Sequence, residues 1–352
     1  MKKSKQYTFI DLFSGAGGMS YGFEMAGFKP LLAIDNWQDA LDTYKRNNPE
    51  VDTLCEDLST ADVVEIVDKY NLKNVDLIVG GPPCQGFSVA GKRIVDDVRN
   101  KLYKSFVSFV KECKPKVFVM ENVPNILSIG EGQIRESIIS DFSKLGYNVE
   151  CKILTASDFG VPQNRRRAIF VGTLNKNFSF PSPTVVDRVT TSQAISDLPE
   201  NTVADGTGYK STADSDYQKW ARYGSDAIYN QEATTHNERT VHIISLVPDG
   251  GNYKDLPEEF QNTRKVHIAW TRLNSGKPSI TIDTGHRHHF HYCYNRIPTV
   301  RECARIQSFP DKYVFLRSRT SQYKQVGNAV PPLMAKAIAE KVKESLNIEY
   351  DV

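Results

Sequence analysis

The sequence predicts an α/β protein built on a doubly wound, mainly parallel sheet, with a smaller, loop-rich second domain. Short apolar runs alternate with amphipathic stretches through residues 8–171, as they do in βαβ units. Several of the apolar runs end on a polar or charged side chain, at the sheet edge where such folds bind ligands. From about residue 178 to residue 290 the periodicity fades, and Ser, Thr, Asn, Gly, Asp and Tyr become frequent, which is typical of a loop-rich recognition region.

Each predicted element follows from a local pattern. Strands are expected where β-branched, aromatic and other apolar residues run together, at residues 8–13, 30–34, 51–54, 75–79, 116–120, 147–154 and 168–171. Helices are expected where apolar residues recur at helical spacing, at residues 19–26, 41–47, 63–70, 102–112, 133–145, 301–307 and 335–345.

Bulk composition restricts the class of protein. A chain of 352 residues is long enough for two domains. The formal net charge is only +2, so a nucleic-acid site would have to be a local patch. Six cysteines without a CxxC pair indicate reduced thiols and an intracellular protein. No stretch reads as a membrane span or a signal core, so we expect a soluble cytoplasmic protein.

A glycine-rich turn follows the first strand, at residues 11–18 (Asp-Leu-Phe-Ser-Gly-Ala-Gly-Gly). Glycines there let a ligand contact the backbone and the start of the next helix. Asp35 closes the second strand, where an acid can hold a ribose hydroxyl pair. Asp57 ends the third strand, where it suits an adenine amino group. Because the spacing is not GxGxxG, a dinucleotide fits poorly, and a nucleoside without phosphate, such as S-adenosylmethionine, fits better. Either aspartate alone could instead be a helix cap.

A cysteine lies just past the fourth predicted strand, in residues 80–85 (Gly-Gly-Pro-Pro-Cys-Gln). The glycines permit close backbone approach and the prolines stiffen the loop, so Cys84 is presented as a nucleophile would be. A lone cysteine is more often a packed core residue. Glu121 ends the next strand and should share the same sheet edge, where a thiol and a carboxyl suit acid-assisted nucleophilic attack. The alternative for Glu121 is a strand end that leads into a proline turn.

Taken together, these blocks and others resemble the C5-cytosine-specific DNA methyltransferase family of the bacterial restriction–modification type. The resemblance extends over both ends of the chain, in the family order, and weakens between residues 178 and 290. Its motifs are residues 11–18, 80–85, 121–123 (Glu-Asn-Val), 163–167 (Gln-Asn-Arg-Arg-Arg), 299–310 (Thr-Val-Arg-Glu-Cys-Ala-Arg-Ile-Gln-Ser-Phe-Pro) and 325–332 (Gln-Val-Gly-Asn-Ala-Val-Pro-Pro).

The resemblance implies a Rossmann-like, S-adenosylmethionine-dependent methyltransferase fold. It implies a catalytic and cofactor-binding domain at 1–177, a target recognition domain at 178–292 and a return to the catalytic domain at 293–352. The implied catalytic residues are Cys84, Glu121, Arg167 and Arg165. The implied cofactor-binding residues are Phe13, Gly15, Gly17, Asp35, Asp57, Pro82, Leu102 and Asn328. Asp35 departs from the family pattern, which more often has Glu there.

The implied reaction is covalent. Cys84 would add to C6 of a cytosine, Glu121 would contact N3, and Arg167, with Arg165 beside it, would reach O2. Because stacking blocks the ring faces, the base must be flipped out of the duplex, and residues 85–99 would form a mobile lid over it. The alternative for residues 85–99 is an ordinary surface loop.

Basic residues in the second half suggest a DNA-binding cleft, at Arg165, Arg166, Arg167, Arg287, Arg296, Arg301 and Arg305. For Arg301 and Arg305 we favour a solvated or salt-bridged helix face instead. Residues 277–282 resemble the family segment that places a threonine, here Thr281, near the flipped nucleotide. The run at 284–291 is rich in histidine but lacks a metal-ligand pattern; no metal is expected, and a DNA-contacting loop or a plain surface loop remains open.

The expected partner is double-stranded DNA, with a monomeric enzyme in the nucleoid-associated cytoplasm and no stable complex with any cognate restriction endonuclease. One alternative is a tRNA cytosine-5 methyltransferase of the same superfamily, although the Cys-Phe-Thr signature usual there is missing. A second is a non-catalytic DNA-binding relative, and a third is an unrelated oxidoreductase. The DNA sequence that is recognised cannot be read from the variable middle region.

Overall fold

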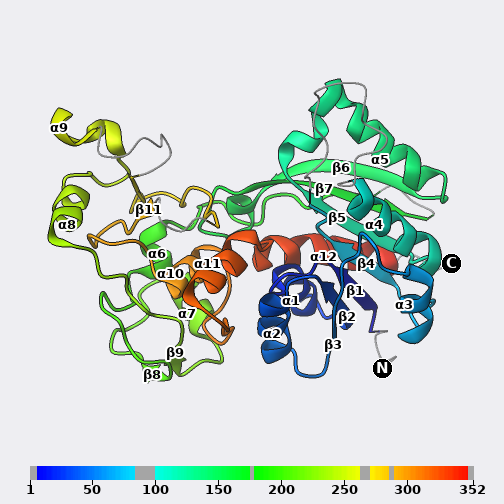
Figure 1. The fold of residues 1–352 in the computed structure, drawn as a ribbon, viewed down its shortest axis with the longest axis horizontal. Coiled ribbons are helices and arrows are strands. Elements are labelled where there is room, and N and C mark those ends of the chain that lie inside the picture. The colour runs from blue at the N-terminus through cyan, green and yellow to red at the C-terminus, as the bar shows by residue number, and fades with distance from the viewer. Residues whose placement is uncertain (1–5, 84–99, 175–177, 262–269, 285–288, 348–352) are drawn as a thin grey trace. The chain divides into compact units, whose positions relative to one another are not determined.

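Two compact units make up the fold in a computed structural model, which describes residues 6–83, 100–174, 178–261, 270–284 and 289–347 (Figure 1). Unit 1 comprises Met1–Thr155, Arg166–Thr184 and Met334–Val352, and unit 2 comprises Ala156–Arg165 and Val185–Leu333. Residues 293–333, predicted to return to the catalytic domain, thus cluster with unit 2. The functional division at residues 178 and 293 stays a prediction.

Unit 1 is organised around a seven-stranded sheet in the order β3-β2-β1-β4-β5-β7-β6. The first five strands in this order pair in parallel, and β7 pairs antiparallel with β5 and with β6. The strands are β1 Thr8–Leu12, β2 Lys29–Asp35, β3 Asp52–Cys55, β4 Leu77–Gly80, β5 Val117–Asn122, β6 Asn148–Thr155 and β7 Arg166–Thr173. The predicted fold class, α/β with a mainly parallel sheet, is confirmed.

The central strands form because their side chains are buried on both faces, which requires continuous apolar runs rather than alternation. β4 is buried at all four positions and β1 at four of five. Aromatic rings from flanking helices pack on the sheet: Phe118 of β5 lies 4.0 Å, between ring centroids, from Phe142 and 6.1 Å from Phe106. Gly172 of β7 is paired with Phe118, and the ring occupies the space where its side chain would be.

The helices of unit 1 confirm the predicted helical segments, with ends shifted by a few residues. They are α1 Gly18–Met25, α2 Gln38–Asn47, α3 Val63–Lys69, α4 Asn100–Cys113, α5 Gln133–Ser143 and α12 Pro332–Asn347, with 3-10 turns η1 Pro124–Leu127 and η2 Ile129–Gly132. The first two residues of α12 belong to unit 2.

Unit 2 has short elements joined by long irregular stretches, as its composition predicts. Its helices are α6 Thr191–Ile195, α7 Asp216–Arg222, α8 Glu238–Ser245, α9 Glu258–Gln261, α10 Val300–Ile306 and α11 Arg319–Asn328, with η3 Ala156–Phe159 and η4 Tyr253–Asp255. Its strands are β8 Thr207–Gly208, β9 Ala227–Ile228, β10 Thr271–Arg272 and β11 His289–Phe290. Hydroxyl and amide side chains cap several of these helices, among them Thr299 at α10 and Ser318 at α11.

Arg296, Arg301 and Arg305, which the sequence suggested for a basic cleft, are instead buried in unit 2, as is Arg165. Arg301 and Arg305 are fully buried, and Arg296 is 7% exposed. Arg305 pairs with Asp197 and Asp311, and Arg296 forms a two-pronged contact of 2.7 and 2.8 Å with Glu302. The prediction of a basic cleft is therefore wrong for these buried side chains. The alternative of a salt-bridged face is right about ion pairing for Arg305 and wrong about solvation.

The described histidines of the run at 284–291 are also interior, whereas Thr284 is exposed. His289 is 7% exposed and His291 is fully buried. The Nδ1 atom of His291 accepts the backbone N–H groups of Cys293 and Tyr294, each at 3.1 Å, and burial lowers the pKa of this imidazole to about 4. These two residues therefore form neither the predicted DNA-contacting loop nor a surface loop; residues 285–288 lie outside the described residues.

Candidate active site

The turn between β1 and α1 is built from left-handed backbone. Phe13, Gly15 and Gly17 have φ angles of 59°, 52° and 88°, of which only the glycines adopt this region without strain. The turn is held against the next strand, since the Ser14 N–H donates to the carbonyl of Ile34 at 3.1 Å. A non-glycine residue with positive φ at such a turn indicates a functional constraint.

Asp35 joins the turn to the end of β2. Its Oδ2 atom accepts the backbone N–H of Gly15 at 2.8 Å, and its Oδ1 atom accepts that of Trp37 at 2.9 Å. A carboxylate oxygen can accept more than one hydrogen bond, so Asp35 can also receive hydroxyl groups. The structure thus brings Phe13, Gly15, Gly17 and Asp35 together; that they bind a cofactor stays a prediction.

The same turn shows room and polar capacity for a ligand. A side chain added at Gly15 would meet nothing within 4 Å. The Ser14 hydroxyl is buried and has no hydrogen-bond partner among the described residues, although buried hydroxyls are normally paired. A nucleoside that carries hydroxyl and amino groups fits these features.

Asp57 occupies a different setting from the one predicted. It lies two residues past the end of β3 and is exposed. Its carboxylate accepts the backbone N–H of Ser59 at 2.9 Å, and hydrogen bonding to Ser59 lowers its pKa. Asp57 therefore stabilises a local turn and is not the helix cap considered as the alternative, since Asp62 is the N-cap of α3; its role toward an adenine stays a prediction.

Sequence reasoning missed a buried polar chain beneath the turn. The Tyr44 hydroxyl donates to Ser20 Oγ at 2.9 Å, and Ser20 Oγ donates to Asp11 Oδ2 at 2.6 Å. Burial raises the pKa of Asp11 to about 7, and burial raises that of Glu24 in α1 to about 7 as well. An aspartate inside an otherwise apolar buried strand was the available signal.

A carboxylate and a guanidinium form the polar centre at the end of β5. Arg167 Nε lies 2.6 Å from Glu121 Oε1, and the two side chains are 15% and 14% exposed. The pairing of β5 with β7 brings them together, because Asn122 pairs with Ala168 and Arg167 directly precedes Ala168. Arg167 Nη1 also donates to the carbonyl of Arg166 at 2.7 Å.

The loop that leads to Cys84 is anchored to this pair. A side chain at Gly80 would come within 2.3 Å of the Leu12 carbonyl, so this position requires glycine, and one at Gly81 would lie 3.0 Å from Glu121 Oε2 and press on the end of that side chain. Asn122 Nδ2 donates to the carbonyl of Pro82 at 2.9 Å. Cys84 and the predicted lid at 85–99 lie outside the described residues.

The remaining predicted residues are distributed over both units. Leu102 of α4 is half-buried and packs against the core of unit 1. Arg165 belongs to unit 2, is 3% exposed, and donates from Nη1 to the Ile282 carbonyl at 3.3 Å. Asn328 ends α11, also in unit 2, and is exposed. That Arg165 and Asn328 join the residues of unit 1 at one site stays a prediction.

The described residues show neither a candidate metal centre nor a membrane span. Among the described residues, no group of three or more His, Cys, Asp or Glu side chains could hold a metal ion. Within the same ranges, no helix has the length and apolar character needed to cross a membrane.

Comparisons with known proteins agree with this geometry. The family model of the C-5 cytosine-specific DNA methylase matches residues 7–344. The chain is 42% identical over 339 residues to the Type II methyltransferase M1.HphI of Haemophilus parahaemolyticus, covering 95% of this chain and 86% of the relative. It is 40% identical over 377 residues to M.DdeI of Desulfomicrobium norvegicum, covering 97% and 90%.

A solved structure extends the similarity to the whole fold. A crystal structure described as a prophage-encoded DNA modification methyltransferase of E. coli superposes with a TM-score of 0.81 and 29% identity, over 97% of this chain and 100% of that one. With the seven-stranded sheet and the family match across almost the full chain, the conclusion is that the chain belongs to the C-5 cytosine-specific DNA methylase family and is an enzyme of that class.

Proposed function

We propose that the protein methylates C5 of a cytosine within a specific sequence of double-stranded DNA, using S-adenosylmethionine and a transient bond between Cys84 and C6 of the flipped-out base. The observation that carries this proposal is the Glu121–Arg167 pair, 2.6 Å apart. The pair lies beside Gly81, and Gly81 belongs to the loop that leads into Cys84.

The pair suits the polar edge of cytosine. N3 and O2 are neighbouring atoms of that edge, and Glu121 and Arg167 present a carboxyl and a guanidinium side by side. Glu121 would hydrogen-bond N3 as charge builds there, and Arg167, assisted by Arg165, would stabilise charge on O2. Both side chains of the pair are largely shielded from water, which strengthens such contacts.

Cys84 would supply the nucleophile as a thiolate. Its addition to C6 moves electron density to C5, which is otherwise too weak a nucleophile for alkylation. After C5 has been alkylated, loss of the C5 proton to a base and expulsion of the Cys84 thiolate would restore the aromatic ring. These steps need both ring faces exposed, so the base must leave the stack.

The glycine turn fits the cofactor through its open space at Gly15, the unpaired Ser14 hydroxyl and the Asp35 carboxylate. When bound, S-adenosylmethionine would supply an electrophilic methyl group. Asp35 would accept the ribose hydroxyls, Asp57 would face the adenine amino group, and Phe13 would line the site. The full set of proposed cofactor residues is Phe13, Gly15, Gly17, Asp35, Asp57, Pro82, Leu102 and Asn328.

The proposed partner is duplex DNA, bound by a monomer in the nucleoid-associated cytoplasm without a stable endonuclease complex. A trapping experiment tests the chemistry. A duplex that contains 5-fluorocytosine, incubated with S-adenosylmethionine, should yield a covalent adduct on Cys84 by mass spectrometry, because fluorine cannot leave as the C5 proton does. Cys84→Ala should form no adduct and still bind DNA. An adduct on another residue, or methylation of tRNA in preference to duplex DNA, would contradict the proposal.

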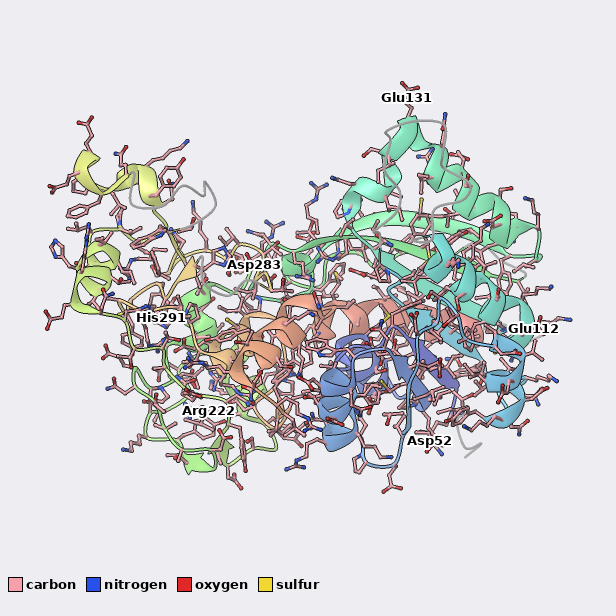
Figure 2. The ribbon with its side chains drawn as sticks, viewed as in Figure 1. Asp52, Glu112, Glu131, Arg222, Asp283 and His291 are labelled. Carbon is pink, nitrogen blue, oxygen red and sulfur yellow. The ribbon has the colours of Figure 1, made fainter. Side chains whose placement is uncertain are left out.

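A second test addresses Glu121. Glu121→Gln should lower kcat by roughly 10- to 150-fold, which corresponds to the roughly 1.5–3 kcal/mol of a hydrogen bond to a charged group. Glu131, which is exposed on η2 and labelled in Figure 2, offers a control, since Glu131→Gln should leave kcat unchanged. Equal rates for both variants would remove Glu121 from the chemistry.

A further inference from the structure

A buried polar contact in unit 2 joins two side-chain amides. Gln163 and Gln307 are both 0% exposed. Gln163 Nε2 donates to Gln307 Oε1, and also to the Ile306 carbonyl at 3.3 Å. Buried amides are costly unless their polar atoms are paired, so a contact between two of them, 144 residues apart in the chain, needs an explanation beyond packing.

The other polar atom of each amide explains the contact, because it binds backbone. Gln163 Oε1 accepts the backbone N–H of Ile282 at 3.0 Å, and Gln307 Nε2 donates to the carbonyls of Val326 and Ala329 at 3.1 and 2.6 Å. A backbone N–H can only donate and a carbonyl can only accept. These partners therefore fix the orientation of both amides, and the contact between them runs in one direction.

The first segment tied by this relay is the stretch around Ile282. It is also bonded to the loop at 162–165: the Ser279 N–H donates to the Pro162 carbonyl at 2.9 Å, and the Asn164 N–H to the Ser279 carbonyl at 2.8 Å. Thr281, the threonine assigned to the flipped nucleotide, is exposed directly before Ile282. Gln163 therefore fixes the register of the segment that presents Thr281.

The second segment is the C-terminal end of α11. The carbonyls that accept from Gln307 flank Asn328, the residue assigned to the cofactor. Gly327 packs so closely on the first segment that a side chain there would lie 2.5 Å from the carbonyl oxygen of Asp283 (labelled in Figure 2). The two segments thus touch each other and are also bonded through the relay.

We propose that the Gln163–Gln307 amide relay is a positioning device that couples the target-contacting segment at Thr281 to the cofactor-contacting end of α11. This inference rests on the proposed function, because that function assigns Thr281 and Asn328. Neither glutamine touches a substrate in this role; each holds backbone that does. The relay makes the placement of one segment depend on the other.

Two carboxylate variants separate the two halves of the relay. Gln163→Glu keeps the acceptor for Ile282 N–H but loses the donor to Gln307. Gln307→Glu keeps the acceptor for Gln163 but loses both donations to the α11 end. Gln307→Met removes the amide without burying a charge. It therefore distinguishes loss of the amide contacts from disruption of folding by a buried carboxylate.

The readouts are two equilibrium affinities and the melting temperature. S-adenosylhomocysteine binding is measured by calorimetry without DNA, and binding of duplex DNA by fluorescence anisotropy with and without S-adenosylhomocysteine. The duplex carries the target sequence, mapped beforehand by bisulfite sequencing of DNA from cells that express the protein. Gln307→Glu and Gln307→Met should raise the Kd for S-adenosylhomocysteine roughly tenfold or more. Gln163→Glu, which keeps the contact with Ile282 but loses the donation to Gln307, should change each separate Kd less and should reduce the factor by which S-adenosylhomocysteine changes the Kd for DNA.

Gln218 provides a matched control in the same unit. It is also 0% exposed, its Nε2 donates to Ser196 Oγ at 2.8 Å, and its Oε1 accepts from the start of α7. Gln218→Glu should lower the melting temperature and leave both affinities unchanged. The relay is overturned if the variants at Gln163 and Gln307 behave like Gln218→Glu, or if S-adenosylhomocysteine changes the Kd for DNA by the same factor in Gln163→Glu as in the wild type. A wild-type protein that binds neither ligand would instead refute the proposed function, and the relay with it.

Discussion

Replacing Asp311 with asparagine should destabilise unit 2 far more than removing an exposed ion pair. Asp311 is fully buried; it accepts two hydrogen bonds from Arg305, at 2.8 and 2.6 Å, and one from Tyr209. Arg301 Nη1 lies 3.8 Å from its Oδ1 atom. Burial alone would raise the pKa of Asp311, but the charges and hydrogen bonds of Arg305 and Arg301 hold it below the ordinary value.

The magnitude follows from burial. Breaking a buried ion pair by removing one partner costs about 3–5 kcal/mol, because the other charge is left uncompensated. For a unit of this size that corresponds to a fall in melting temperature of roughly 6–20 °C. Because the folded-state pKa is depressed, this stability is present at neutral pH and lost as pH falls through that pKa, so the measurement belongs at pH 7.

Asp216 supplies the control, since its contact with Lys219 is 3.0 Å but the two side chains are 99% and 62% exposed. Asp216→Asn should cost about 0–1 kcal/mol. The assay is calorimetric melting of both variants in one buffer. A fall for Asp311→Asn no larger than that for Asp216→Asn would refute the reasoning. It would reopen the alternative that Arg301 and Arg305 serve DNA rather than the core.

Three further outcomes are expected. Burial raises the pKa of Asp11 to about 7, so its contribution to the free energy of unfolding should be present below pH 3.8 and lost as pH rises through about 7. Asp11→Asn should remove this change from a plot of the free energy of unfolding against pH. An unchanged plot would contradict the prediction. Gly172→Ala would place a carbon 2.0 Å from the Phe118 ring and should cost about 1–3 kcal/mol or more; Phe118→Leu in the same chain should relieve the clash, and strictly additive effects in chemical denaturation would disprove the contact. Arg167→Met should lower kcat by roughly 10- to 150-fold through loss of the charged contact with Glu121, and steady-state kinetics that show only a raised KM would contradict its role in charge stabilisation.

The sheet of unit 1 could be predicted because its signal is local. β4 and β5 are buried on both faces, so their sequences are continuous apolar runs, and the polar residue at a strand end marks the reactive edge. Glu121 was found in this way. Asp11 was harder to find, because its role comes from Ser20 and Tyr44, whose positions depend on how α1 and α2 pack.

Unit 2 was harder to predict, because its contacts also depend on how the chain folds. α11 has a largely polar sequence, and its buried residues include Ser321, Gln325 and Gly327 beside Tyr323 and Val326, so no apolar periodicity predicts this helix. A buried, paired arginine looks the same in sequence as an exposed one, and Arg305 meets its partner Asp197 only through the fold, 108 residues away. Likewise, nothing near Gln163 in the sequence points to Gln307.

The way the chain enters unit 2 constrains the construction of chimeras. An exchange that replaces only residues 178–292 would put the donor's residue in place of Asp197, the partner of Arg305. It would also replace the backbone at Ile282, which donates to Gln163. A donor fragment cut at residues 185 and 333, carried together with residues 156–165, would bring its own ion pairs and anchors. Hybrids with altered specificity should therefore fold when the seams follow these boundaries, and fail when they follow the edges of the variable region.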